Sequence, residues 1–138
     1  GDPELPVYPR SSIKPLQAIP LVETGAAEAF GLGDAEIALA CASHRGERRH
    51  VETVANWLKR IGLSERDLEC GAHAPYDAAA AAALAQAGEK PSALHNNCSG
   101  KHAAMLTCAL HKGERTRGYI ERTHPVLRAA SGRRRPRA

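Results

Sequence analysis

The stretch that most constrains the fold lies near the middle of the chain, where residues 95–102 (HNNCSGKH) run directly into the apolar residues 103–106. Asn and Ser are favoured N-cap residues, because their side chains bond the amides that a first helical turn leaves unpaired. A helix is therefore predicted to begin between Asn97 and Ser99 and to end before Gly113. The polar octapeptide is therefore predicted to lie at the start of a helix that carries an apolar stripe.

Cys98 and Lys101 give this helix start its chemistry. A thiol at the N-terminal end of a helix is favoured as the thiolate, and a residue three positions later lies on the same face. Together the two side chains can supply half of a metal site, although C-x-x-K is not a standard zinc signature. From the spacing alone, a half-buried cysteine beside a solvated lysine is the favoured alternative.

A second pattern, Ser11-x-x-Lys14, precedes Pro15. Proline fits a first helical turn, so the pair is predicted to lie at a helix start. A serine hydroxyl needs a base, and a desolvated lysine can be neutral enough to take its proton. Penicillin-binding proteins use this arrangement. Alone, however, the tetrapeptide is more typical of a helix cap with a surface lysine.

Three strings carry a family resemblance: residues 8–17 (YPRSSIKPLQ), residues 40–44 (ACASH) and residues 95–106. They resemble segments of the bacterial L-asparaginases of the rhizobial type, the asparaginase II family, and the resemblance extends to about residue 128. It implies hydrolysis of L-asparagine to L-aspartate and ammonia. It also implies an α/β architecture similar to that of serine β-lactamases and glutaminases.

The resemblance also implies site residues. Ser11, Lys14 and Ser43 would be catalytic, whereas Cys98 and Lys101 would bind zinc. Taken alone, Ser43 reads as an ordinary turn serine. In the mechanism that these residues support, Ser11 attacks the carboxamide, Lys14 takes the proton and water completes the cycle. Which serine is the nucleophile stays open, as does the preference for asparagine over glutamine.

Three further side chains have weaker assignments. Arg10 is a candidate for binding the substrate carboxylate through a charge-assisted pair, and His102 for orienting substrate or metal. His44 has the right chemistry for a general base, a role that we do not assign. Cys70 and His73 are compatible with a second metal half-site, but a structural loop is favoured.

Part of the implied site has no counterpart here. The family's proteins are considerably longer, and their second half supplies a further zinc-binding cysteine and a second catalytic lysine. We therefore expect an N-terminal-half fragment with one domain over residues 1–128. Its catalysis and its zinc site would then be incomplete. The alternative is a non-catalytic remnant of the family that binds a metal or a partner.

For the chain itself we expect a mostly α-helical fold with one or two short strands. Residues 37–42 are the predicted strand, favoured by the resemblance because periodicity cannot separate a short buried strand from a helix. The predicted helices cover residues 16–32 with interruptions at Pro20 and Gly25, residues 47–61 as an amphipathic helix, and residues 78–87 after Asp77.

The net charge of +4 lies in the C-terminal end, because residues 128–138 hold five arginines and no acidic residue. The rest of the chain is slightly acidic. Residues 129–138 are expected to be a disordered basic tail, which can bind phosphate backbones without sequence specificity. No aromatic residue lies between these arginines, so nucleic-acid binding is the least favoured hypothesis.

No apolar run approaches the ~20 residues that a membrane span needs. The four cysteines show no compact pairing pattern, and no basic-then-apolar leader opens the chain, so reduced thiols and a cytoplasmic location are expected. The expected partner is a small-molecule substrate. A homo-oligomer is also expected, because strand edges without partners favour self-association.

Overall fold

The computed structural model describes residue 2, residues 4–6 and residues 8–131, and every regular element in these residues is a helix. The α-helices are α1 (Lys14–Glu23), α2 (Ala26–Ala29), α3 (Asp34–Cys41), α4 (Arg48–Arg60), α5 (Ala78–Gln86), α6 (Ser99–His111) and α7 (Pro125–Ala130). Short 3-10 helices complete the elements: η1 (Arg10–Ile13), η2 (Glu65–Asp67) and η3 (Ala93–His95). The prediction of a mostly helical chain is confirmed for this part of the sequence.

The predicted strand over residues 37–42 is wrong, and within the described residues no strand takes its place. These residues belong to α3, apart from Ala42, which follows it. The Glu36 carboxylate accepts a hydrogen bond from the Gly33 N–H at 3.0 Å and thereby closes the first turn. The buried face of the helix consists of Glu36, Leu39 and Ala40. An alanine-rich run that is capped and buried on one face is stable as a helix.

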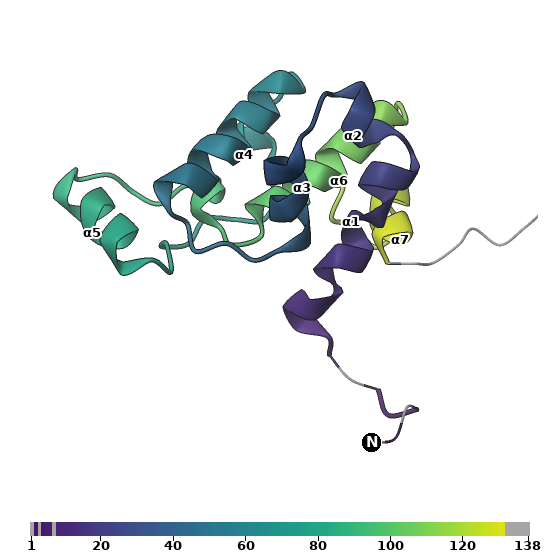
Figure 1. The fold of residues 1–138 in the computed structure, drawn as a ribbon, viewed down its shortest axis with the longest axis horizontal. Helices are drawn as coiled ribbons and strands as arrows, with labels where there is room; N and C mark the ends of the chain where they lie inside the picture. Colours follow the sequence, from purple (N-terminus) through teal and green to yellow (C-terminus); the bar gives the residue numbers. More distant parts are fainter. Residues whose placement is uncertain (1, 3, 7, 132–138) are drawn as a thin grey trace, which may run out of the picture.

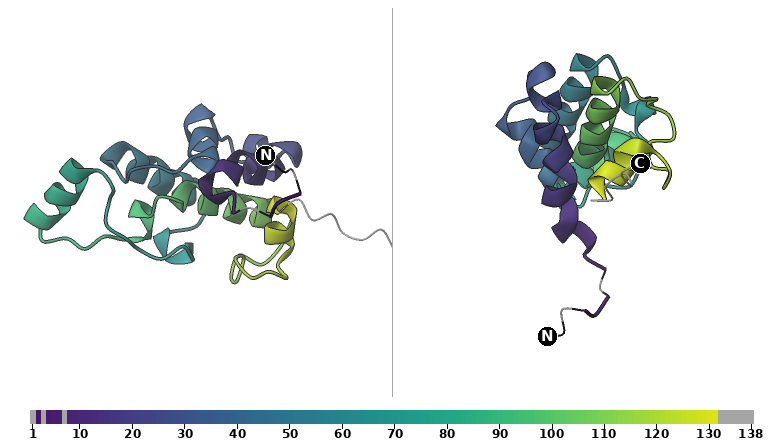
Figure 2. Two further views of the ribbon diagram at one scale, coloured as in Figure 1. Left: turned by 90° about the horizontal axis from the view of Figure 1, so that it is seen from below. Right: turned by 90° about the vertical axis from the view of Figure 1, so that its right-hand side faces the viewer.

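Helix α6 forms the centre of the fold. Almost all of its residues are buried, and α1, α2, α3, α4 and α7 pack against it. Figures 1 and 2 show it running through the middle of these helices. Trp57 on α4 is fully buried and donates its indole N–H to Thr107 on α6 at 3.0 Å. The bond satisfies the one polar group of the largest core side chain.

The predicted boundaries of two helices are close to those observed, and the break expected at Gly25 separates α1 from α2, but α1 continues through Pro20 without an interruption. Helix α6 has Cys98 at its N-cap and ends two residues before Gly113, which has a φ of 65°. The amphipathic helix predicted over residues 47–61 is α4, and it buries Val54, Trp57 and Leu58. The C-terminal ends were predictable because Gly62 and Gly113 follow them in the left-handed conformation, whereas neither N-cap side chain forms a capping hydrogen bond.

Helix α5 stands apart from the rest. The Asp77 carboxylate caps it by accepting from the Ala80 N–H at 2.9 Å, as the sequence predicts. None of its residues is buried, and Figure 1 shows it at one end of the molecule. An alanine run forms a helix readily but offers little side-chain surface for packing.

The C-terminal end differs from the expectation for residues 129–138. Helix α7 continues to Ala130, which is buried, so the folded part extends past residue 128. The arginines from residue 133 onwards lie outside the described residues, and so do the expectations about their disorder and nucleic-acid binding. Every described helix falls short of the length and apolar character that crossing a bilayer requires.

One close contact places the start of α6. A Cβ added to Gly100 would lie 2.5 Å from the carbonyl oxygen of Leu39 on α3. Only glycine allows the two backbones to approach so closely. The contact brings the residues around Cys98 next to the loop that follows α3.

Candidate functional site

Three segments that are distant in the sequence meet at the start of α6. The first runs from η1 into α1, the second is the loop after α3, and the third leads into α6. Lys14, the first residue of α1, is only 2% exposed. Its ammonium donates to Ser43 Oγ at 2.7 Å, to Ala42 O at 3.0 Å and to Asn97 O at 3.4 Å. One buried amine therefore connects all three segments.

The two predicted catalytic serines are hydrogen-bonded to each other. Ser43 Oγ lies 2.9 Å from Ser11 Oγ, so a continuous chain leads from Ser11 through Ser43 to Lys14. The expectation from the S-x-x-K spacing was a direct contact between Ser11 and Lys14, but the Lys14 amine bonds Ser43 instead. Both serines are exposed, whereas the amine is buried. A small molecule can thus approach the hydroxyls from solvent while the base stays sheltered.

The surroundings of Lys14 favour its neutral form. Burial lowers the pKa of the Lys14 amine below its ordinary value of 10.5, and the positive charge of Lys101 acts in the same direction. The neighbouring Cys98 thiol opposes this change, because it stabilises the charged amine. Removing an ammonium from water costs free energy that only part of these contacts recovers.

His44 is 4% exposed and anchors the loop after Ser43 through hydrogen bonds of both ring nitrogens. The Gly46 N–H donates to His44 Nδ1 at 3.1 Å, so Nε2 carries the proton and donates to Ser99 Oγ at 2.8 Å. Burial, reinforced by the charges of His50 and Lys14, lowers the pKa of His44 to about 4. Both ring nitrogens already have backbone or buried partners. His44 is therefore a neutral anchor of the loop, and its geometry gives no support for a general-base role.

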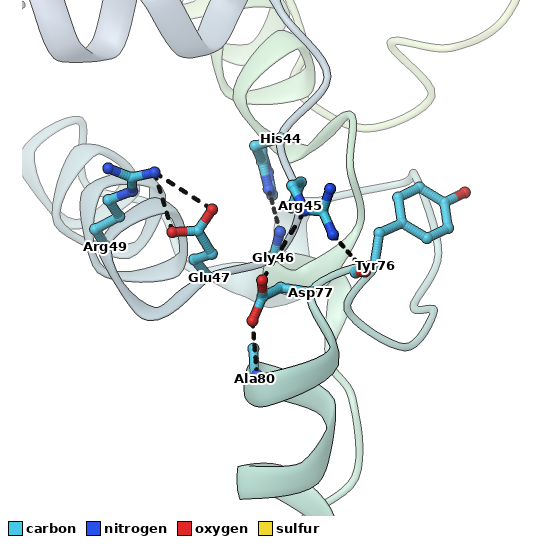
Figure 3. A network of polar contacts seen from close by, with 8 residues as sticks. All are labelled: His44, Arg45, Gly46, Glu47, Arg49, Tyr76, Asp77 and Ala80. Carbon is cyan, nitrogen blue, oxygen red and sulfur yellow. Dashed lines mark hydrogen bonds and ion pairs between the residues drawn. The ribbon is translucent and has the colours of Figure 1, made fainter.

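Figure 3 shows how the same loop is joined to the residues before α5. The Arg45 guanidinium lies 3.9 Å from the Asp77 carboxylate and donates to Tyr76 O at 3.3 Å. The Asp77 N–H donates to Arg45 O at 2.9 Å. These contacts fix the backbone two residues beyond Ser43.

The predicted zinc ligands lie together at the start of α6, Cys98 at the N-cap and Lys101 in the first turn. Zinc sites in proteins use three or four protein ligands. Residues 2, 4–6 and 8–131 contain no group of three or more His, Cys, Asp or Glu side chains placed to hold a metal ion. Burial raises the pKa of the nearby Cys70 thiol to about 11, and the charges of Cys98 and Lys101 act on it in opposite directions. Cys98 and Lys101 are thus two donors, fewer than the three or four ligands of a protein zinc site.

The two weaker assignments have different outcomes in the structure. Arg10 precedes Ser11, is exposed and forms no ion pair with any described residue. Its φ of 49° is uncommon for a bulky side chain. His102 points into the core instead. Its Nδ1 is hydrogen-bonded to the Tyr119 hydroxyl at 2.8 Å, and burial lowers its pKa to about 3.

Sequence reasoning missed the supporting role of three residues. The Asn96 side chain accepts from the Cys98 N–H at 2.8 Å and donates to the carbonyls of Cys70 and Gly71. The Asn97 carbonyl accepts from Lys14, and His73 accepts from the Asn97 N–H. The octapeptide at residues 95–102 contains both asparagines, but each of these hydrogen bonds has a backbone group as one partner. The amino-acid sequence does not show which backbone groups will be neighbours.

The comparisons with known proteins agree with the family resemblance at its coarser level. The family model described as L-asparaginase II matches residues 1–133. A search of curated proteins found no match to the chain. The matched range includes every residue discussed for the site.

Proposed function

The chain belongs to the L-asparaginase II family, and from this premise we propose that it is an asparaginase-type amidohydrolase of the rhizobial, serine–lysine type, in which Lys14 serves as the base without the second lysine expected from the family. Its substrate is the side-chain amide of L-asparagine, and its products are L-aspartate and ammonia. We further propose a cytoplasmic location. This location suits four cysteines that are all described and all free of disulfides.

The observation that carries the proposal is the hydrogen-bonded chain Ser11–Ser43–Lys14, with O···O and O···N distances of 2.9 Å and 2.7 Å. A serine is activated when a base within hydrogen-bond reach removes its proton. The lowered pKa of Lys14 suits such a base. The two exposed hydroxyls sit where a substrate amide can reach them.

The contacts of Lys14 also suit the neutral form of the amine. A neutral amine has two N–H groups and one lone pair. The carbonyls of Ala42 and Asn97 accept the two N–H groups, which leaves the lone pair for the Ser43 hydroxyl. With a charged amine, Lys14 donates to Ser43 and Ser43 donates to Ser11. With a neutral amine both bonds reverse, so that Ser43 donates to Lys14 and accepts from Ser11.

In the first half of the reaction, Ser11 Oγ attacks the carboxamide carbon. The Ser11 proton passes to Ser43 as the Ser43 proton passes to Lys14. The tetrahedral adduct then breaks its C–N bond, and the proton returns from Lys14 through Ser43 to the leaving nitrogen, which departs as ammonia. The product of this half is an acyl ester on Ser11.

In the second half, water attacks the ester carbon and gives its proton to the same relay. The C–O bond to Ser11 breaks, Ser11 takes the proton back, and aspartate leaves. We place the α-carboxylate of the substrate against Arg10, which is exposed and directly precedes Ser11. Cys98 and Lys101 are proposed as two zinc donors that need a further ligand, and no step is assigned to the metal.

The test is release of ammonia from L-asparagine by the full chain. General acid–base catalysis contributes about 10²–10⁴-fold, so Ser43→Ala should reduce turnover by at least about a hundredfold. Ser11→Ala should abolish it. Ser12→Ala is the matched control and should change little, because the Ser12 hydroxyl bonds Pro9 O outside the relay.

No ammonia release from the folded wild-type chain would contradict the proposal and favour the non-catalytic alternative. Turnover that survives Ser43→Ala would contradict the relay. Running the assay with L-glutamine in parallel determines which amide the site prefers.

A further inference from the structure

The loop before α5 holds an imidazole, His73, that the mechanism above does not use. Its Nδ1 lies 2.7 Å from Ala74 O, and its Nε2 lies 3.0 Å from the Asn97 N–H. A carbonyl can only accept a hydrogen bond, so Nδ1 carries the proton and Nε2 accepts from the amide. Nε2 also lies 3.4 Å from Asn97 Oδ1, which is a longer contact than the one to the amide. The two shorter contacts therefore specify the tautomer with the proton on Nδ1.

The position of this ring is fixed from two sides. Tyr76 stacks on it with a centroid distance of 4.9 Å and an interplanar angle of 28°. The loop itself is tied to the residues before α6, because Asn96 Nδ2 donates to Cys70 O at 2.9 Å and to Gly71 O at 3.0 Å. These contacts hold the imidazole where its Nε2 accepts a hydrogen bond from the Asn97 N–H.

Asn97 connects this acceptor to the site. Its N–H is bonded to His73, and its carbonyl accepts from the Lys14 amine at 3.4 Å and from the His44 N–H at 3.1 Å. Both polar groups of the Asn97 backbone therefore have partners, and the direction of the carbonyl is determined. The Asn97 carbonyl is one of the two carbonyls that accept the N–H groups of Lys14. When the amine is neutral, its lone pair is then directed to the Ser43 hydroxyl.

We propose that His73 is a positioning residue for Lys14, acting through the backbone of Asn97. By accepting the Asn97 N–H, it holds the Asn97 carbonyl where it orients the Lys14 amine toward Ser43. The consequence for turnover rests on the proposed serine–lysine chemistry, whereas the geometric part of the inference does not.

Two conservative variants separate this role from general packing. In His73→Gln, the amide oxygen extends to about the position of the imidazole Nε2 and can still accept the Asn97 N–H. The shorter side chain of His73→Asn is equally polar but cannot reach it. The matched control is His111→Gln, which replaces a histidine bonded to Thr24 O at the opposite end of α6.

The first readout is amide hydrogen exchange by NMR in the full chain, which requires no activity. In His73→Asn, the amides of Asn97 and His44 should exchange at least about tenfold faster, because both depend on the orientation of Asn97. The ¹³Cε resonance of Lys14 should shift as well. His73→Gln should stay close to wild type, and His111→Gln should leave all three signals unchanged.

The second readout is kinetic. His73→Asn should lower kcat at least about tenfold and change KM less than about threefold, because a misplaced base slows the reaction without removing a substrate contact. His73→Gln should recover most of kcat. If the wild-type chain releases no ammonia, the proposed function fails, and the exchange data still decide whether His73 positions Lys14.

Two results would overturn the inference. One is a folded His73→Asn variant in which the His44 amide exchange and the Lys14 resonance are both unchanged. The other needs no variant: ¹⁵N spectra of the wild-type chain showing that His73 Nε2, not Nδ1, carries the proton. The ¹⁵N spectra test whether His73 Nε2 can accept the Asn97 N–H even if His73→Asn does not fold.

Discussion

Ser43 Oγ lies 2.7 Å from Lys14 Nζ, although 29 residues separate them in the sequence. Lys14 opens α1, and Ser43 follows α3, so the contact depends on the packing of these two helices against each other and against α6. The amine is buried and the hydroxyl is exposed. A sheltered base next to a reachable hydroxyl is the arrangement on which the proposed chemistry depends.

Lys14→Met should remove turnover and leave the fold intact. The methionine is close to lysine in length but lacks the base, so ammonia release should fall by at least about a hundredfold. The free energy of unfolding should stay near the wild-type value or rise, because a desolvated amine is no longer buried. Urea unfolding measured with the ammonia assay checks both parts. A marked loss of stability would show that the Lys14 contacts are mainly structural.

The stability of the chain should decrease in mild acid because of His44. Its pKa is about 4 in the folded state and near 6.5 when unfolded, so the unfolded chain binds the proton first as the pH falls. The contribution of His44 is complete above about pH 6.5 and is lost between pH 6.5 and 4, at most about 3 kcal/mol. His44→Gln should flatten this part of the profile in urea unfolding between pH 4 and 8. Parallel profiles for the two chains would contradict the assignment.

Gly100→Ala should destabilise the fold and disturb the site together. The new methyl group would lie 2.5 Å from Leu39 O, so α6 and α3 must move apart. Overpacking of this kind costs about 1–3 kcal/mol. Gly33→Ala is the matched control, because its Cβ would meet nothing closer than a Glu36 oxygen at 3.6 Å. Equal unfolding midpoints for the two variants would show that α6 does not depend on this contact.

Zinc should bind weakly to this chain. Cys98 and Lys101 supply two donors, and protein zinc sites use three or four. Metal analysis after dialysis against zinc should give well below one ion per chain, and Cys98→Ala should remove what remains. Cys108→Ala is the control, because that thiol is buried in the core away from the helix start. A full equivalent of tightly bound zinc would mean that further ligands complete the site.

Local chemistry made several features predictable from the sequence. Asp77 caps α5, Cys98 and Ser99 begin α6, and Gly113 follows its end, because a cap or a turn depends on a few neighbouring residues. The prediction of a strand at residues 37–42 was wrong because local chemistry does not decide this segment. Six apolar residues are compatible with either structure, and burial of Leu39 and Ala40 against the other helices decides between them.

By itself, the sequence determined the residue types of the site, since Ser11, Lys14, Ser43 and Cys98 all belong to recognisable strings. Only the tertiary structure decided which of them touch. It placed Ser43 between Ser11 and Lys14, turned His102 toward Tyr119, and brought His73 to the backbone of Asn97. The physical reason is that hydrogen bonds to backbone groups, and contacts between helices far apart in the chain, depend on packing around α6. No local pattern of side chains encodes them.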